Sequence, residues 1–420
     1  MDGATAHLAR RRALPLLAVV VLLALHVFAY PATRFSNDSY RYARQAYEFL
    51  GDSPQRARQK AVAAYCADTA RLVHRNRLLD QRRFAEPGRE AAYRHGCEAK
   101  YRDGLTPTGA EYERIFRTRP GYPLLAAPFV ALLGAKAGLT AVSLAFTAAA
   151  GWLVYLLLRA LRSPPPAAVL GQVLYYVTPL AQWGGRPLSE GPVTALMTAL
   201  LLASVWLLCG RVARGAALFA GAFALGCAVK YSSFLIVGLF LAVAAFAILL
   251  FVRRARQRGT WVLAGLATAG TVGVLAVSAA FGLPGTTDSL QDMFTLHWTH
   301  PEVASPWRSL LRLDSHYWWQ WLQKEALAPL LLTLLAAGAW GLWKRSVPVA
   351  LCVLATGLTG FATMAAHPLA VEQDRLYVQV WLIPVIGLPL ALERLWRRGG
   401  TASAASGGDR TAGEPAGCAG

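Results

Sequence analysis

Long blocks of apolar residues, separated by short basic connections, make up most of the chain after residue 120. Many of these blocks hold roughly 17–25 residues with almost no charge, the length that an α-helix needs to cross the hydrocarbon core of a bilayer. The pattern predicts an all-α polytopic membrane protein with about ten spans. We expect the first span at 13–30 and the others at about 139–158, 167–183, 190–209, 214–229, 231–252, 260–282, 326–343, 347–366 and 376–392.

One apolar run, Leu124 to Gly134, is too short to cross the bilayer comfortably. It follows the segment Arg119-Pro120-Gly121-Tyr122-Pro123, and we predict a short re-entrant or half-span helix there. The multi-span membrane domain then covers residues 121–395, with an outer loop at 283–325.

The segments outside the spans differ in character. Residues 31–120 are polar and of mixed charge with helical spacing, and we predict that they form a helical extracytoplasmic cap. Residues 1–12 are expected to be cytoplasmic, so that 13–30 is a retained signal anchor and not a cleaved signal peptide. The Gly-, Ala- and Ser-rich segment 396–420 is predicted to be a disordered cytoplasmic tail.

Arginines and lysines in the short connections predict the orientation of the chain. With the N-terminus inside, every short basic connection falls on the cytoplasmic side, as the positive-inside rule requires. This agreement holds only if the short run at 121–134 is not a full crossing. Both termini are then cytoplasmic, the first loop is extracytoplasmic, and we expect the plasma membrane. The basic connections lie at 159–162, 211–214, 253–258, 344–345 and 394–398.

Composition supports this interpretation and excludes one class of protein. The chain is 55% hydrophobic and only 15% charged, whereas soluble chains carry charge on about a quarter of their residues. The net charge of +19 at pH 7 invites a nucleic-acid interpretation. We reject it, because the arginines flank apolar blocks or lie beside acids in the long loop, where lipid headgroups explain them. We expect the protein to contact the lipid bilayer and not to bind nucleic acid.

Two of the six cysteines, Cys66 and Cys97, share the long first loop. They could form a disulfide if this loop faces an oxidising compartment. The sequence leaves both states open.

Five charged residues near the predicted outer membrane edge are candidates for chemistry: Asp38, Arg119, Glu190, Lys230 and Arg375. Asp38 could accept a proton or hold a divalent metal, but an aspartate there is equally suited to cap a helix. Glu190 opens a span and could simply complement the helix dipole. Arg119 could reach to lipid headgroups, and Arg375 could mark a charged span boundary. Lys230 lies between two apolar runs, where an ionisable group is costly and indicates function by default.

A metal site has less support. His297 and His300 lie one turn apart and could bind a metal if their segment is helical. Because no third ligand is fixed beside them, we assign no metal ligand and no cofactor, and a divalent metal stays an open alternative.

The order of these features resembles the GT-C glycosyltransferases: a first span, an outer Asp-x-x-x-Tyr-Ala stretch at 38–43, a helical cap, and then Arg-Pro-Gly-Tyr-Pro-Leu-Leu at 119–125. This superfamily includes the protein O-mannosyltransferases, the aminoarabinose transferases of lipid A and actinobacterial relatives, and the resemblance covers about residues 10–395. It implies an inverting membrane enzyme. Such an enzyme moves a sugar, mannose-like or other, from a polyprenyl-phosphate donor to an extracytoplasmic glycan, lipid or protein acceptor.

The resemblance also implies roles for individual residues. Asp38 would be the first-loop acid that orients or deprotonates the acceptor, and Glu190 corresponds to a second acid of the relatives. Lys230, Arg375 and Arg119 would hold the donor phosphate. The residues implied to line the substrate are Tyr40, Tyr42, Tyr122 and Tyr377.

Many members of the superfamily carry Asp-Glu in the first loop, where this chain has Asn37-Asp38-Ser39; the missing second acid argues against a metal-bound site. The chain has no P-loop and no Gly-rich phosphate cradle, so the sugar donor is expected to be lipid-linked. Two other classes are alternatives: a transporter or flippase of a lipid-linked envelope precursor, and a non-catalytic membrane scaffold. The apolar mid-span positions and the lack of an inverted repeat count against a transporter.

Overall fold

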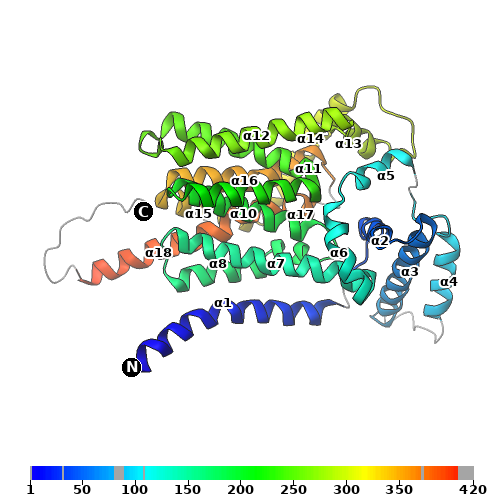
Figure 1. The fold of residues 1–420 in the computed structure, drawn as a ribbon, viewed down its shortest axis with the longest axis horizontal. Coiled ribbons are helices and arrows are strands. Elements are labelled where there is room, and N and C mark those ends of the chain that lie inside the picture. The colour runs from blue at the N-terminus through cyan, green and yellow to red at the C-terminus, as the bar shows by residue number, and fades with distance from the viewer. Residues whose placement is uncertain (1, 31–32, 80–88, 107–108, 370–372, 405–420) are drawn as a thin grey trace.

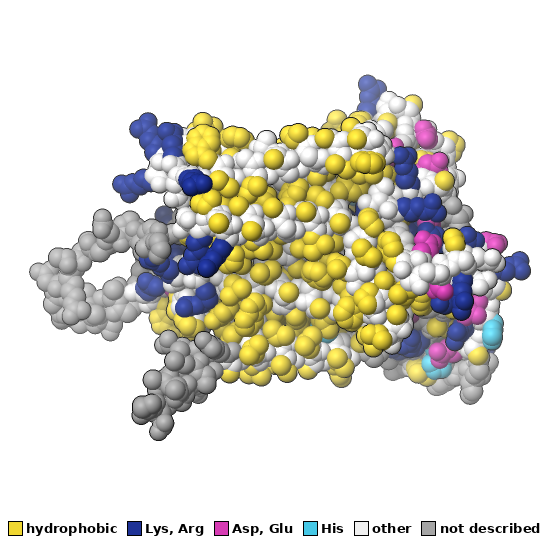
Figure 2. All heavy atoms as spheres, viewed as in Figure 1, with side chains coloured by type: hydrophobic (Ala, Val, Ile, Leu, Met, Phe, Trp, Pro, Cys, Tyr) yellow, Lys and Arg dark blue, Asp and Glu magenta, His cyan; other side chains and the backbone are white. Residues whose placement is uncertain are grey.

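The computed structural model describes residues 2–30, 33–79, 89–106, 109–369 and 373–404, and within these every regular element is helical. Long helices pack side by side in a bundle, and shorter helices gather at one of its ends (Figure 1). On the face shown in Figure 2, hydrophobic side chains cover the bundle between two charged ends. In the described residues, six stretches are long and apolar enough to cross a membrane, or seven if one bent helix pair counts as a span. The chain is an all-α polytopic membrane protein, as predicted.

The helix α10 (Glu190–Leu208) lies at the centre of the bundle, because 94% of its apolar stretch is buried inside the protein. Around it, α7, α11 and α16 cover its sides. The other five candidate spans are α7 (Ala135–Ala160), α11 (Val212–Phe251), α12 (Arg258–Phe281), α16 (Val347–Ala366) and Val378–Arg397, which joins the short helix η3 (Val378–Trp381) to α18 (Leu382–Ala404).

Helix α11 turns back on itself at Lys230. Its 40 residues would extend about 60 Å as a straight helix, twice the hydrocarbon thickness of about 30 Å. The ring centroids of Phe223 and Phe234 lie 6.0 Å apart, although a straight helix would separate these positions by about 16 Å. Lys230 has the non-helical angles φ −161° and ψ 76°. Two antiparallel arms therefore meet at Lys230, in agreement with the predicted spans at 214–229 and 231–252.

The short apolar run forms α6 (Gly121–Leu133), which confirms that this segment is a short apolar helix. Gly134 follows with a φ of +79°, which favours glycine, and reverses the chain into α7. The two helices then pack so closely that a Cβ on Gly138 would lie 2.5 Å from the backbone nitrogen of Val130. Figure 1 shows α6 at the bundle end that carries the shorter helices.

The span expected at 167–183 is not continuous. It is divided into α8 (Pro165–Val177) and α9 (Pro179–Gly184). Pro179 lacks the backbone N–H that a continuous helix requires, and it keeps the preceding Thr178 extended, with φ −98° and ψ 171°.

The outer loop expected at 283–325 is largely helical. It contains α13 (Thr286–Phe294) and most of α14 (Pro306–Leu327). The span expected at 326–343 lies mostly in α15 (Leu330–Arg345), which is bent by 87° from α14.

Both ends of the described chain lie at the bundle end opposite the shorter helices (Figure 1). The first helix, α1 (Asp2–Ala29), contains the apolar stretch Ala13–Ala29 of the span predicted at 13–30, which is shorter than the six candidate spans. The tail predicted to be disordered from residue 396 is helical as far as Ala404, where α18 ends. An ion pair of 2.6 Å between Glu393 and Arg397, one turn apart, supports this extension. Residues 405–420 lie outside the described residues.

Four helices between α1 and α6 form a cap: α2 (Asn37–Phe49), α3 (Pro54–Leu79), α4 (Arg89–Lys100) and α5 (Ala110–Arg117). Cys66 and Cys97 form a disulfide between α3 and α4, with their Cα atoms 5.6 Å apart. The structure thus contains the disulfide that the sequence left open.

Asp68 of α3 ties the cap to the bundle. Its side chain is buried, and its carboxylate accepts hydrogen bonds of 2.8 Å from the backbone N–H of Phe35 and from Nζ of Lys136 at the start of α7. Lys136 also donates to the carbonyl oxygen of Thr33, at 2.6 Å. Because a buried carboxylate needs such partners, this cluster determines where the chain enters α2.

We expect Asp68→Ala to lower the free energy of unfolding by about 3–5 kcal/mol, because it leaves Lys136 buried without its counter-charge. The matched control is Asp52→Ala, which removes a cap ion pair with Lys60, whose side chain is 40% exposed. This control should lose less than about 1 kcal/mol. Unfolding in detergent micelles, with the cap disulfide intact, measures both variants. Equal losses would contradict the role of Asp68.

Candidate functional site

Asp38 lies in the first turn of α2 but does not cap this helix. Ser36 is the N-cap: its hydroxyl accepts the N–H of Ser39, and the Ser39 hydroxyl accepts the N–H of Ser36. The Ser39 hydroxyl also donates to the carbonyl oxygen of Pro187, at 2.8 Å. The alternative in which Asp38 is the helix cap is therefore wrong, and its carboxylate binds another partner.

That partner is Arg375, which joins Asp38 to Glu190. Arg375 belongs to the short helix α17 (Gln373–Leu376). Its Nη2 donates to Oδ2 of Asp38 and its Nε donates to Oε1 of Glu190, both at 2.6 Å. Both bonds join opposite charges, the strong class of hydrogen bond. One guanidinium thus brings together the starts of α2 and α10 with α17.

Lys230 completes this ionic cluster from the reversal in α11. Its Nζ lies 3.9 Å from Oε1 of Glu190, whose side chain is 6% exposed. The second carboxylate oxygen of Glu190, Oε2, is buried and has no hydrogen-bond partner among the described residues. An unpaired buried acceptor costs free energy, so a hydroxyl donor placed here would be stabilised.

Arg119, between α5 and α6, lies beside the ionic cluster. Here α6 packs against the end of the first arm of α11, since a Cβ on Gly121 would lie 2.7 Å from the carbonyl carbon of Ala228. The Nε of Arg119 is buried and has no hydrogen-bond partner within the part of the chain that the structure describes. This guanidinium can therefore bind a further acceptor.

The charges of the cluster change the pKa values of Asp38 and His367. Burial raises the pKa of Asp38, but the charges of Arg375 and Lys230 more than offset this effect and hold that pKa below its ordinary value. Burial, aided by the charge of Lys230, lowers the pKa of His367 to about 4. At neutral pH, Asp38 is therefore ionised and His367 is neutral.

Two of the four tyrosines implied to line the substrate, Tyr42 and Tyr122, lie next to the cluster. They form a buried edge-to-face pair, with 4.9 Å between ring centroids. The Tyr42 hydroxyl lies 3.2 Å from Oγ of Ser189, the residue before Glu190, and burial raises the pKa of Tyr42 to about 12. The Tyr122 hydroxyl donates to the carbonyl oxygen of Leu139, at 3.0 Å.

The other two tyrosines pack against different groups. Tyr40 is buried, with the guanidinium of Arg41 5.7 Å from its ring centroid. Tyr377 donates its hydroxyl hydrogen bond to Asp374, at 3.1 Å, and its ring lies 6.4 Å from that of Phe361.

Sequence reasoning missed Arg41, which is fully buried in the same helix as Asp38. Its Nε lies 3.2 Å from Oε1 of Glu113 on α5, and its guanidinium carbon lies 4.4 Å from the ring centroid of Tyr112. The available signal was the spacing of three residues between Asp38 and Arg41, which places both on one face of a helix.

The two histidines that could bind a metal on a helix, His297 and His300, do not lie on one. His297 has a φ of +62°, and its Nδ1 lies 2.8 Å from Oδ1 of Asp292. Within the described ranges, no group of three or more His, Cys, Asp or Glu side chains could hold a metal ion.

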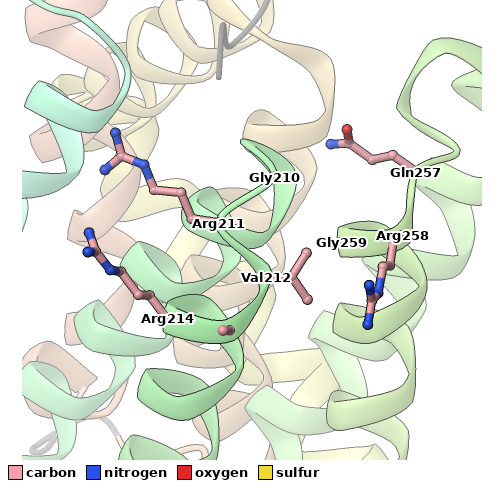
Figure 3. Close-up of a pocket in the computed structure, with 8 residues that line it drawn as sticks. Gly210, Arg211, Val212, Arg214, Gln257, Arg258 and Gly259 are labelled. Carbon is pink, nitrogen blue, oxygen red and sulfur yellow. The ribbon is translucent and has the colours of Figure 1, made fainter.

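A hollow lies at the opposite end of the bundle, beyond the last turn of α10 (Figure 3). The 19 residues of α10 place it about 28 Å from Glu190. It is therefore separate from the ionic cluster. Its lining residues are Gly210, Arg211, Val212, Ala213, Arg214, Gln257, Arg258 and Gly259.

The fold and the ionic cluster define a polytopic membrane protein with carboxylates and cations paired at its capped end. No protein-family model matches the chain, and no curated protein matches it.

We expect Arg375→Gln to lower the free energy of unfolding by about 3 kcal/mol, because it leaves Asp38 and Glu190 without their shared cation. Adding Asp38→Asn removes one of these two charges. The double variant should therefore lose less free energy of unfolding than the two single variants lose together. Unfolding of all four proteins in detergent micelles measures this coupling, and strictly additive losses would contradict it.

The stability should also depend on pH through Asp38. Because its pKa is below the ordinary value of about 3.9 in the folded state, its contribution is fully present above that value. The contribution is lost as the pH falls through the lower folded pKa. Thermal unfolding is followed from neutral to acid pH. The melting temperature of Asp38→Asn should fall less at acid pH than that of the unmodified chain. If the melting temperatures of both proteins fell equally with pH, Asp38 would not be the source of this dependence.

Proposed function

We propose that the protein is an inverting membrane glycosyltransferase of the GT-C type. It transfers a sugar, mannose-like or other, from a polyprenyl-phosphate donor to a glycan, lipid or protein acceptor outside the plasma membrane. The observation that carries this proposal is the bridge of Arg375 between two carboxylates, Asp38 and Glu190, at one end of the spanning helices. The disulfide in the cap at the same end suits an oxidising, extracytoplasmic compartment.

Lys230 and Arg119 are the phosphate ligands in this proposal. The Nζ of Lys230 is 3.9 Å from Glu190, longer than a hydrogen bond, so its N–H donors can turn towards a phosphate. The buried Nε of Arg119 would gain a charge-assisted partner from a phosphate oxygen. Because α11 spans the bilayer, a lipid-linked phosphate can approach Lys230 from within the membrane.

Asp38 is the base in the proposed reaction. The acceptor oxygen attacks the anomeric carbon while the bond from that carbon to the phosphate oxygen breaks, which inverts the configuration. The hydroxyl proton passes to the Asp38 carboxylate, and the phosphate leaves with the electron pair of the broken bond. Lys230 and Arg119 stabilise the charge on the leaving phosphate. The unpaired Oε2 of Glu190 accepts a hydrogen bond from a substrate hydroxyl.

Arg375 receives a different role from the one that the resemblance implies. Two of its hydrogen bonds go to carboxylates, so we assign it to hold Asp38 and Glu190 in position. It also reduces the repulsion between these two negative charges.

We expect Asp38→Asn to reduce transfer by at least about 100-fold, because the base is removed while the shape of the side chain is kept. Lys230→Gln should reduce transfer as well, through weaker binding of the phosphate. The matched control is Glu302→Gln, an exposed acid of the outer loop, which should leave transfer unchanged. Membranes that hold each variant are supplied with radiolabelled polyprenyl-phosphate sugars, and transfer is measured. Full transfer by Asp38→Asn would exclude it as the base.

Mass spectrometry of envelope glycans and glycoproteins from a deletion strain would identify the product. The loss of one sugar would name both the donor and the acceptor class. An unchanged set of glycans with accumulated lipid carrier would instead support the flippase alternative. A scaffold would keep its function when Lys230 and Arg375 are substituted.

A further inference from the structure

The hollow at the opposite end of the bundle is strongly basic. Three arginines, Arg211, Arg214 and Arg258, contribute to its lining. Figure 3 shows Arg211 and Arg214 extending to the same side of the first turn of α11, with Arg258 at the start of α12. In Figure 2, Lys and Arg side chains gather at this end of the apolar belt, whereas acidic side chains are seen at the capped end.

Among the described residues, no acid pairs with these arginines. The two connections that form the hollow, 209–215 and 252–260, contain no Asp or Glu. Within the described residues, Arg211, Arg214 and Arg258 make no ion pair and no side-chain hydrogen bond. Elsewhere at the same end, Glu393 pairs with Arg345 at 3.4 Å and with Arg397 at 2.6 Å. Within the part of the chain that the structure describes, the positive charge of the hollow is thus local and has no acidic partner.

The backbone adds further donors. Both α11 and α12 begin at the hollow, and neither has a side-chain cap at its N-terminus. The first N–H groups of each helix therefore have no partner within the helix. Gly259 lets the start of α12 approach α10, because a Cβ there would lie 1.9 Å from the carbonyl oxygen of Leu207. This close packing places the start of α12 beside the end of α10, so that Arg258 lines the hollow across from Arg211 and Arg214 (Figure 3).

We propose that this hollow binds the phosphate of an anionic phospholipid headgroup. Guanidinium groups and helix N-termini are both suited to phosphate oxygens. The hollow lies at the end of spanning helices, the depth at which headgroups lie. This site is independent of the ionic cluster at the capped end, and therefore of the proposed transferase activity.

The test uses the purified full-length chain in detergent micelles, with phosphatidylglycerol as the anionic probe and phosphatidylcholine as the neutral probe. Native mass spectrometry measures the lipid that stays bound. The variant Arg211→Gln/Arg214→Gln should weaken the binding of phosphatidylglycerol by about tenfold or more. The matched control, Arg253→Gln/Arg254→Gln, removes the same charge from exposed residues of the connection 252–260 that do not line the hollow, and it should change binding far less.

The other possible results each support or overturn the proposed lipid site. Equal losses in the two double variants would overturn it, because diffuse charge would then explain the binding. It would also be overturned if phosphatidylcholine bound as well as phosphatidylglycerol, or if inorganic phosphate displaced the lipid, since the site would then take free phosphate. If Arg211→Gln/Arg214→Gln fails to fold, Arg258→Gln on α12 serves as the second variant. A selective loss of phosphatidylglycerol in that variant supports the site, and unchanged binding refutes it.

Discussion

The arrangement at the capped end depends on the pairing of buried charge around Arg375. A carboxylate removed from water without a partner costs several kcal/mol, and two adjacent carboxylates would also repel each other. Asp38 and Glu190 can lie together at the edge of the spanning helices because one guanidinium binds both. This requirement draws the start of α2 towards α17, although 337 positions in the sequence separate Asp38 from Arg375.

Local contacts and backbone geometry determine the position of each charged group in the cluster. The Ser36–Ser39 capping box begins α2 without using the Asp38 side chain, and the buried Asp68 holds the backbone just before that helix. Lys230 lies at a break in helical geometry, so the lysine reaches the cluster from between two apolar arms. These contacts fix the positions of the charges, as electrostatic stabilisation of the transition state in the proposed transfer would require.

Features with a local signature could be predicted from the sequence, whereas features that arise from distant contacts could not. Apolar length predicted the spans, and a single lysine between two apolar runs indicated the reversal at Lys230. The break before Pro179 also has a local cause, but the apolar residues on both sides of it predicted one continuous span. The charged residues of the site could be selected by type and by position at the membrane edge. The two partners of Arg375 could not be predicted, because no pattern near residue 375 depends on residues so far away in the chain.

The balance of charge in the cluster bears on the proposed donor. Asp38 and Glu190 contribute two negative charges, and Arg375, Lys230 and Arg119 contribute three positive charges. His367 adds none at neutral pH, because burial lowers its pKa to about 4. Arg186 adds a further positive charge, because its pKa responds to burial and to the charges of Arg375 and Glu190. The positive charges around the bridge therefore outnumber the two carboxylates. A negatively charged phosphate placed beside Lys230 and Arg119 would offset this excess, which agrees with a phosphate-linked donor in the proposed transfer.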